Sequence, residues 1–136
     1  MNRIILILMA LMLCSVNSPA QTIRNANNAT MAKFDADGTL RNANNAAIAR
    51  IDSNGDIRNS NNRYLGKICS NGDIRNSNNS YLGKVEDNGT VRNSNNATLG
   101  KVESDGTVRD NNNRTIGYAR GVPMTYAAVF FFFDFF

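Results

Sequence analysis

Arginine and lysine stand at regularly spaced places in this chain, and they are the residues with the clearest capacity to bind a ligand. Arginine follows an aliphatic residue and precedes Asn or Asp, whereas lysine follows glycine in Leu-Gly-Lys. Guanidinium groups bind carboxylates and phosphates through paired hydrogen bonds. A ring of such residues could hold an anionic surface polymer or a lipid headgroup, and its candidate members are Arg41, Arg58, Arg75, Arg92, Arg109, Lys67, Lys84 and Lys101.

Asparagine recurs beside these arginines, in the phrase Arg-Asn-x-Asn-Asn that first begins at Arg24. Asn side chains replace backbone partners in turns and tolerate left-handed conformations, so the pattern favours tight corners. Alternatively, the clustered amides could bind a glycan, with Tyr64 and Tyr81 stacking on the sugar rings. The equivalent places in other units hold smaller residues, which weakens the glycan interpretation: Thr30, Ala47, Thr98 and Thr115.

All these residues belong to a repeat of 17 residues, whose six units begin at Gln21, Gly38, Gly55, Gly72, Gly89 and Gly106. In Val-Glu-Asp-Asn-Gly-Thr-Val, residues 85–91, a three-residue loop that ends at Gly89 pairs Val85 with Val91. A two-residue Asn-Gly turn would place these valines on opposite faces, whereas burial requires them on one face. We therefore predict five complete β-hairpins, each with a type I turn followed by a glycine bulge.

This register places basic side chains directly opposite one another, as in Lys84 and Arg92, and like charges in that position repel. An acidic residue two positions along the same face compensates the charge in four hairpins, at Asp35, Asp52, Glu86 and Glu103. Cys69 takes the place of the acid in the third hairpin. The basic rows are therefore either a self-compensated surface or an anion-binding site.

The two ends of the repeat supply half-hairpins. Ile23 and Arg24 form a second strand without a first, and residues 116–119 form a first strand without a second. Pairing these ends would close the array and remove its free edges. We predict an all-β domain over residues 21–121, with the hairpins arranged radially in a closed ring; an open β-solenoid is the alternative.

The repeat pattern RNxNN…LGK[IV]xx[DN]G[DT][IV]RN resembles that of the bacterial secreted five-fold β-flower proteins. The resemblance extends from residue 21 to about residue 120, and the ending GVPMTYAAVFFFFDFF is similar too. It implies the flower-like fold but no activity and no site, because such families are described by their shape. Five whole hairpins and two halves leave five-fold and six-fold closure open.

Residues 122–136 leave the repeat and form an aromatic segment around Asp134, with Phe130, Phe131, Phe132, Phe133, Phe135 and Phe136. Exposed, such a run would promote aggregation. We expect it to pack on the ring as a closing strand or plug, or to form an interface between copies of the chain.

Residues 1–20 have the pattern of a signal peptide: a basic start, an apolar run from Ile4 to Leu13, and small residues ending at Ala20. This run is shorter than the roughly 20 residues that span a bilayer. We therefore expect an exported protein, periplasmic or extracellular, with no transmembrane segment after cleavage. The alternative is a lipoprotein anchored at Cys14.

The composition argues against catalysis and against nucleic-acid binding. The chain contains no histidine, the commonest general base, and Cys69 is the only cysteine after residue 20. Basic and acidic residues alternate, whereas nucleic-acid binders usually carry an unbroken basic stripe. We expect no cofactor or metal, and two functions remain. One is a binding module for a glycan or anionic surface polymer; the other is an assembly protein that self-associates through its phenylalanines as a homo-oligomer.

Overall fold

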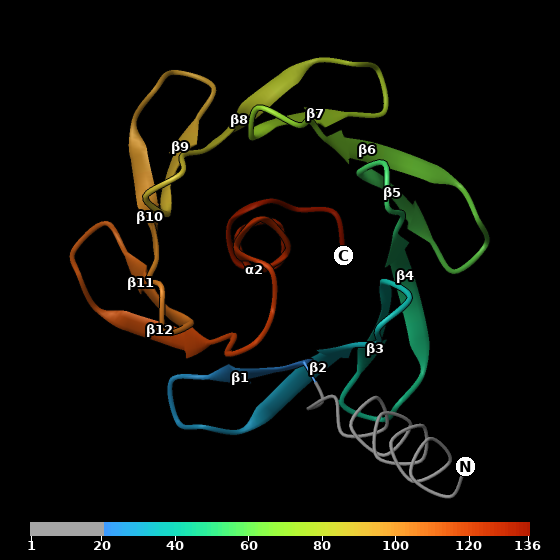
Figure 1. Ribbon diagram of the computed structural model, residues 1–136, viewed down its shortest axis with the longest axis horizontal. Coiled ribbons are helices and arrows are strands. Elements are labelled where there is room, and N and C mark those ends of the chain that lie inside the picture. Colours follow the sequence, from blue (N-terminus) through green and yellow to red (C-terminus); the bar gives the residue numbers. More distant parts are fainter. Residues whose placement is uncertain (1–20) are drawn as a thin grey trace, which may run out of the picture.

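The computed structural model describes residues 21–136 as a closed ring of twelve short strands around one central helix (Figure 1). The proposed signal peptide, with Cys14, lies outside these residues. The strands are β1 (Gln21–Asn25), β2 (Thr30–Phe34), β3 (Thr39–Asn42), β4 (Ala47–Ile51), β5 (Asp56–Asn59), β6 (Tyr64–Ile68), β7 (Asp73–Asn76), β8 (Tyr81–Val85), β9 (Thr90–Asn93), β10 (Thr98–Val102), β11 (Thr107–Asp110) and β12 (Thr115–Tyr118). The helix is α2 (Met124–Phe132).

Glycine closes one set of turns, which join β2 to β3, β4 to β5, and so on to β11. In the turn after β8, the Gly89 amide donates to the Glu86 carbonyl and the Glu86 amide donates to the Thr90 carbonyl, at 2.9 and 2.8 Å. Val85 pairs with Val91 and Lys84 with Arg92. The predicted three-residue loop and its register are confirmed, and the φ of Gly89, +92°, is the left-handed value that this bulge requires.

Asparagine closes the other set of turns, and these are hairpin turns of the same kind. In the turn after β7, the Asn79 amide donates to the Asn76 carbonyl at 2.9 Å, and the Asn76 amide donates to the Ser80 carbonyl at 3.0 Å. The last Asn of every phrase is left-handed, with φ between 64° and 68°. The sequence suggested only a corner here. The structure shows a second hairpin turn in which Asn performs the role of glycine.

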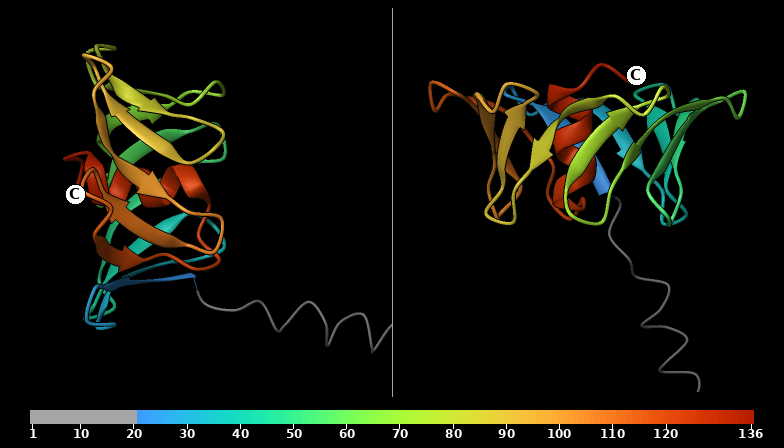
Figure 2. Two further views of the ribbon diagram at one scale, coloured as in Figure 1. Left: turned by 90° about the vertical axis from the view of Figure 1, so that its left-hand side faces the viewer. Right: turned by 90° about the horizontal axis from the view of Figure 1, so that it is seen from above.

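Six hairpins with Asn turns, which we call petals, therefore build the ring: β1–β2, β3–β4, β5–β6, β7–β8, β9–β10 and β11–β12. The glycine turns connect neighbouring petals, and the first and last petals meet where Arg24 of β1 pairs with Tyr118 of β12. The predicted closed ring is thus confirmed, and over residues 21–136 it has six petals. Figure 2 shows the petal tips splayed outward at the end where the C-terminus lies, which we call the petal end.

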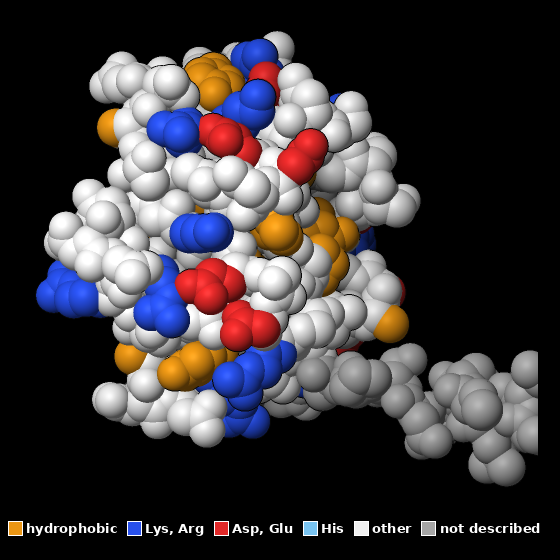
Figure 3. All heavy atoms as spheres, turned by 60° about the vertical axis from the view of Figure 1, so that its left-hand side comes forward, with side chains coloured by type: hydrophobic (Ala, Val, Ile, Leu, Met, Phe, Trp, Pro, Cys, Tyr) orange, Lys and Arg blue, Asp and Glu red, His pale blue; other side chains and the backbone are white. Residues whose placement is uncertain are grey.

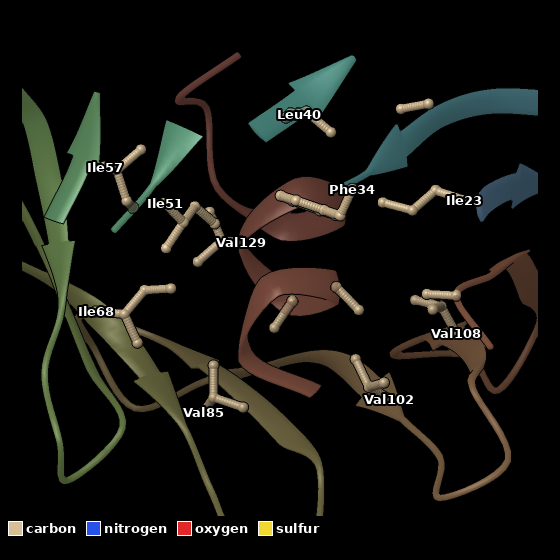
Figure 4. Packing of buried hydrophobic residues seen from close by; sticks show 14 of the residues in the cluster. Ile23, Phe34, Leu40, Ile51, Ile57, Ile68, Val85, Val102, Val108 and Val129 are labelled. Carbon is tan, nitrogen blue, oxygen red and sulfur yellow. The ribbon is translucent and has the colours of Figure 1, made fainter. Parts of the chain in front are cut away.

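Inward-facing aliphatic side chains and α2 form the core (Figure 4). Ile51, Ile57 and Val91 are almost fully buried, as are Ala127 and Val129 of the helix. Phe34 also packs on the helix, with its ring centre 5.2 Å from that of Tyr126. The aromatic segment thus enters the ring as a helical plug and not as a closing strand, because the pairing of β1 with β12 leaves no free edge for another strand.

Phenylalanines at the end of α2 and just after it reach successive petals, in reverse chain order. A methyl group built on an inward-facing glycine would collide with one phenylalanine ring in each of four petals: Gly117 with Phe131, Gly100 with Phe132, Gly83 with Phe133, and Gly66 with Phe135. Buried alanines take this place in the first two petals, at Ala32 and Ala49. Small residues at this position therefore make room for the aromatic segment.

We predict that Gly100→Ala destabilises the protein by about 1–3 kcal/mol, the usual cost of overpacking a core. The added carbon would lie 2.6 Å from the Phe132 ring and would also clash with the Arg109 carbonyl. Denaturant unfolding measures the change. Ala49→Gly, the opposite exchange at an equivalent place, is the control and should cost about 1 kcal/mol or less. Equal costs for the two variants would contradict the packing of Phe132 on Gly100.

We predict that Asn79→Ala lowers the free energy of unfolding by about 1 kcal/mol, because alanine is disfavoured at the positive φ of this residue. Asn79→Gly should leave stability close to that of the unmodified protein, since glycine adopts this conformation freely. Thermal or denaturant unfolding compares them. Asn78→Ala, on the exposed neighbour, is the matched control; a larger loss there than at Asn79 would refute the role assigned to the turn.

Candidate functional site

The outer face of the ring carries the basic rows that the sequence predicted. Lys67 pairs across strands with Arg75, Lys84 with Arg92, and Lys101 with Arg109. Carboxylates lie among them, because Glu86 accepts from the Arg92 guanidinium and Glu103 from that of Arg109. Asp35 and Asp52 bind arginine in the same way, at 2.8 Å from Arg41 and 3.4 Å from Arg58. Figure 3 shows the result, a surface on which basic and acidic groups alternate.

Each arginine of the repeat also supports its own petal tip. One guanidinium nitrogen of Arg92 donates to the Asn96 carbonyl at 3.2 Å, and the same bond recurs in all six petals. Five of the six arginines thus hold the left-handed Asn in place while they also bind a carboxylate. The hydrogen-bonding capacity of these arginines is largely used within the protein, so they have little left for a ligand.

The third glycine turn departs from this arrangement because Cys69 replaces the acid. The nearest carboxylate to Arg75 is that of Asp73, 4.0 Å from its guanidinium. Cys69 itself is half-buried and forms no disulfide within residues 21–136. Among the five basic pairs, Lys67 and Arg75 therefore have the least compensated charge.

The first Asn of each phrase caps its turn. The side-chain oxygen of Asn93 accepts from the amides of Asn95 and Ala97, at 2.9 and 3.0 Å. The middle Asn is exposed, and its amide side chain forms no hydrogen bond within the described part of the chain: Asn27, Asn44, Asn61, Asn78, Asn95 and Asn112. In five petals the first Asn thus caps the turn, whereas in all six the middle Asn presents a free amide near the petal tip.

Asp110 stands where the other five petals have the capping Asn. Its carboxylate accepts from the amides of Arg114 and Asn112, and these backbone hydrogen bonds, that of Arg114 foremost, hold the pKa of Asp110 below its usual value. The Arg114 side chain adds an ion pair at 3.0 Å. Asp37 and Asp105 have lowered pKa values too, because the amides of Thr39 and Thr107 donate to them.

Tyr64 and Tyr81 lie on the outer face of adjacent petals, each opposite an arginine. The guanidinium carbon of Arg58 lies 5.7 Å from the Tyr64 ring centre, and that of Arg75 lies 5.8 Å from Tyr81. Cation–π contacts of this kind hold an aromatic ring in a fixed orientation. Tyr81 is 37% exposed. These two rings offer accessible aromatic surface on the outer face.

A groove separates neighbouring petals on this face. Between β3–β4 and β5–β6 it has a volume of about 160 Å³ and is lined by Thr39, Ala47, Ala49, Arg50, Asn59, Ser60 and Asn62. One repeat later Tyr64 stands at the place of Ala47, and after one more repeat Tyr81 does. A larger polar hollow of about 390 Å³ lies among Asn71, Lys84, Glu86, Asp87 and Asn88.

The petal end carries a different, apolar surface that the sequence analysis missed. A β-bulge adds one side chain to each petal, and in five of the six petals this is an aliphatic residue that packs against the core, as at Leu82 between Tyr81 and Gly83. Leu65, Leu82 and Leu99 line an open groove of about 530 Å³ together with Phe132, Phe133, Phe135, Asp134, Asn76 and Asn93. The sequence signal for this bulge is Tyr-Leu-Gly-Lys, in which Tyr and Lys both face outward and two residues lie between them. In a strand that alternates strictly, the number of residues between two outward side chains is odd.

The phenylalanines that the sequence offered as an interface are placed mostly inside the ring. Phe130, Phe131, Phe132, Phe133 and Phe135 are half-buried and pack against the core. Phe136 is 43% exposed and packs loosely on Phe130 and Phe135, with ring centres 6.3 Å apart in both pairs.

Comparison with known proteins agrees with this architecture. The sequence pattern of one family, described as "5-fold beta-flower protein", matches residues 20–135. The chain therefore belongs to the β-flower family, although the ring that residues 21–136 form has six petals. No curated protein and no solved structure matches it.

Two other kinds of site are absent from residues 21–136. No helix there has the length and hydropathy to cross a membrane. Nor do three or more His, Cys, Asp or Glu residues of that range come together as metal ligands would.

We predict that Asp110→Asn makes stability less dependent on pH. The pKa of Asp110 is lower in the folded than in the unfolded state, so its stabilisation is complete above the unfolded value, about 3.9, and is lost as the pH falls through the folded value. The variant keeps an Asn cap that cannot titrate. The difference in unfolding free energy between unmodified protein and variant should therefore fall between about pH 5 and pH 2.

Asn93→Asp is the reciprocal control for this prediction. This substitution creates the same carboxylate cap in a petal that has Asn. The unfolding free energy of the Asn93→Asp variant should therefore depend more strongly on pH in the acid range, whereas that of Asp110→Asn depends less on it. Asp37 and Asp105 titrate in all three proteins and cancel in the differences. A constant difference between pH 5 and pH 2 would show that the amide bonds do not act on Asp110.

Proposed function

We propose that this protein is an exported, non-catalytic β-flower module that binds a glycan on its outer face. The observation that supports the proposal most directly is the pair of tyrosines on adjacent petals, Tyr64 and Tyr81, each held in place by an arginine on the outer face. Aromatic rings with fixed orientation offer flat apolar surface to the CH face of a sugar. The exposed amides of Asn61 and Asn78 supply hydrogen-bond donors and acceptors beside them.

The glycan is favoured over an anionic polymer because most of the repeat arginines already have partners. Arg41, Arg92 and Arg109 each donate to a carboxylate and to a turn carbonyl. An anionic polymer would have to compete with these bonds. The incomplete compensation at Arg75 makes the petal that carries Tyr81 the place where a negatively charged sugar would be tolerated best.

Two parts of the proposal rest on the sequence. Export, to the periplasm or the cell exterior, rests on the signal-peptide pattern of residues 1–20, with a lipoprotein anchored at Cys14 as the alternative. The absence of catalysis rests on the lack of histidine and on the structural use of the acidic residues, which cap turns or bind arginine.

An array of neutral and anionic oligosaccharides tests the proposal, and we expect the unmodified protein to bind neutral members of it. We predict that replacing Tyr64 and Tyr81 together by alanine abolishes this binding. Aromatic rings that stack on nucleic-acid bases contribute about 1–3 kcal/mol each. If stacking on a sugar is of the same order, losing both rings should weaken affinity at least tenfold. Tyr81→Phe should retain most binding, because stacking does not need the hydroxyl.

The matched control replaces Thr98 and Thr115 by alanine at the equivalent places of two other petals. These threonines accept from Arg92 and Arg109, so the control also removes an arginine partner from each petal. If both double variants bind equally, the tyrosines are not the site. Retention of anionic probes alone, weakening steeply with salt, would instead support the anionic-polymer interpretation.

A further inference from the structure

The petal end combines a hollow and a projection on one face. The hollow is the groove of about 530 Å³ whose floor is formed by Leu65, Leu82 and Leu99 with three phenylalanines. The chain continues past the groove and ends on the side of β4 and β5 (Figure 1). Its final side chain, Phe136, is 43% exposed. An apolar groove and an exposed apolar ring thus lie beside each other on the same surface.

The projecting side includes a second exposed apolar residue. Met31 occupies the bulge position of the first petal, where the equivalent residues Leu65, Leu82 and Leu99 line the groove. It is 39% exposed. Met31 and Phe136 are two of only three large hydrophobic side chains within residues 21–136 that exceed a third exposure, and the third, Tyr81, belongs to the outer face.

Two unpaired charges of opposite sign flank this surface. Asp134 lines the groove and is exposed. Arg63 stands at the tip of petal β5–β6, directly before the strand that supplies Leu65. Neither takes part in an ion pair within residues 21–136. By contrast, Arg114, which occupies the place of Arg63 in the last petal, forms an ion pair with Asp110.

We propose that the petal end is a homodimer interface in which two copies meet face to face about a two-fold axis. A two-fold axis presents the same patch from both partners, so the projection of one copy meets the groove of the other twice. Phe136 and Met31 then enter the apolar groove of the partner, and Asp134 pairs with Arg63 across the interface. This interface uses neither tyrosine, so it is compatible with glycan binding on the outer face and independent of it.

A second copy fits this surface better than a lipid or a small apolar ligand. An apolar ligand would be complemented by the groove alone and would leave Phe136, Met31 and the two free charges without a role. A second copy uses all of these features at once. The groove is also wide open to one end of the ring, as an interface between proteins needs, and pairs of small proteins typically cover about 800 Å² on each partner.

Sedimentation velocity over a concentration series of protein produced from the full-length sequence tests the proposal. The unmodified protein should associate reversibly to a dimer. Asp134→Arg and Arg63→Asp each place like charges opposite one another, and each should weaken dimerisation by about tenfold or more. The two changes combined restore opposite charges in exchanged positions, so the double variant should recover most of the dimer.

The control is Lys101→Asp, a charge reversal on the exposed outer face, which should leave dimerisation unchanged. Thermal unfolding confirms that each variant keeps its fold. Phe136→Ala, which shortens the projection with little loss from the core, should weaken the dimer as well. A dimer lost in both single variants and recovered in the double variant would establish the Asp134–Arg63 contact.

Three results would overturn the proposal. The first is an unmodified protein that stays monomeric at every concentration. The second is a dimer that responds to Lys101→Asp but not to Asp134→Arg, since the interface would then lie on the outer face. The third is a monomer that binds neutral phospholipid vesicles and loses this binding on Leu82→Gln, which would assign the groove to lipid instead.

Discussion

The ring depends on the left-handed residue that closes each of its three-residue turns. Glycine occupies this place at one end of the strands and asparagine at the other. Because both ends of the strands from β2 to β11 are set by the same turn geometry, their register cannot shift at one end without breaking the other. A shift by one residue would bury the lysines and expose the isoleucines and valines. Glycine serves a second purpose, because at Gly38 its carbonyl accepts from the Ile51 amide of the next petal and any side chain would clash there.

A ring built in this way leaves a central space that the repeat cannot fill by itself. Each petal contributes only a few inward aliphatic side chains, too few to meet across the axis. The chain solves this with a segment outside the repeat, in which α2 occupies the axis and the phenylalanines spread to the petals. The ring and its plug therefore require one another, since the glycines that admit the rings would be gaps without them.

The same geometry divides the surface by chemistry. Outward side chains of the strands carry charges, and most of the repeat arginines bind carboxylates as well as turn carbonyls, so the outer face is polar and internally balanced. In five petals the bulge sends one further aliphatic side chain toward the core, and in the first petal it leaves Met31 exposed, so the petal end is apolar. Repetition made these features common to all petals. The features that suggest function are the exceptions to it: two tyrosines, one missing acid, and an asymmetric aromatic ending.

The sequence by itself determined the hairpins with glycine turns, their register and the pairing of the basic residues, because these follow from local turn chemistry and from a burial pattern repeated every 17 residues. It predicted the asparagine turns only as corners. It could not decide six-fold closure, because the two half-hairpins at the ends of the repeat are compatible with an open array as well as with a closed ring. Only the pairing of the two ends in space distinguishes them. Nor could it show that residues 124–132 are helical, because that depends on the size of the central space. The apolar groove with Asp134 was likewise decided by the tertiary structure, since the repeat supplies only its leucines and the aromatic segment that completes it lies outside the repeat.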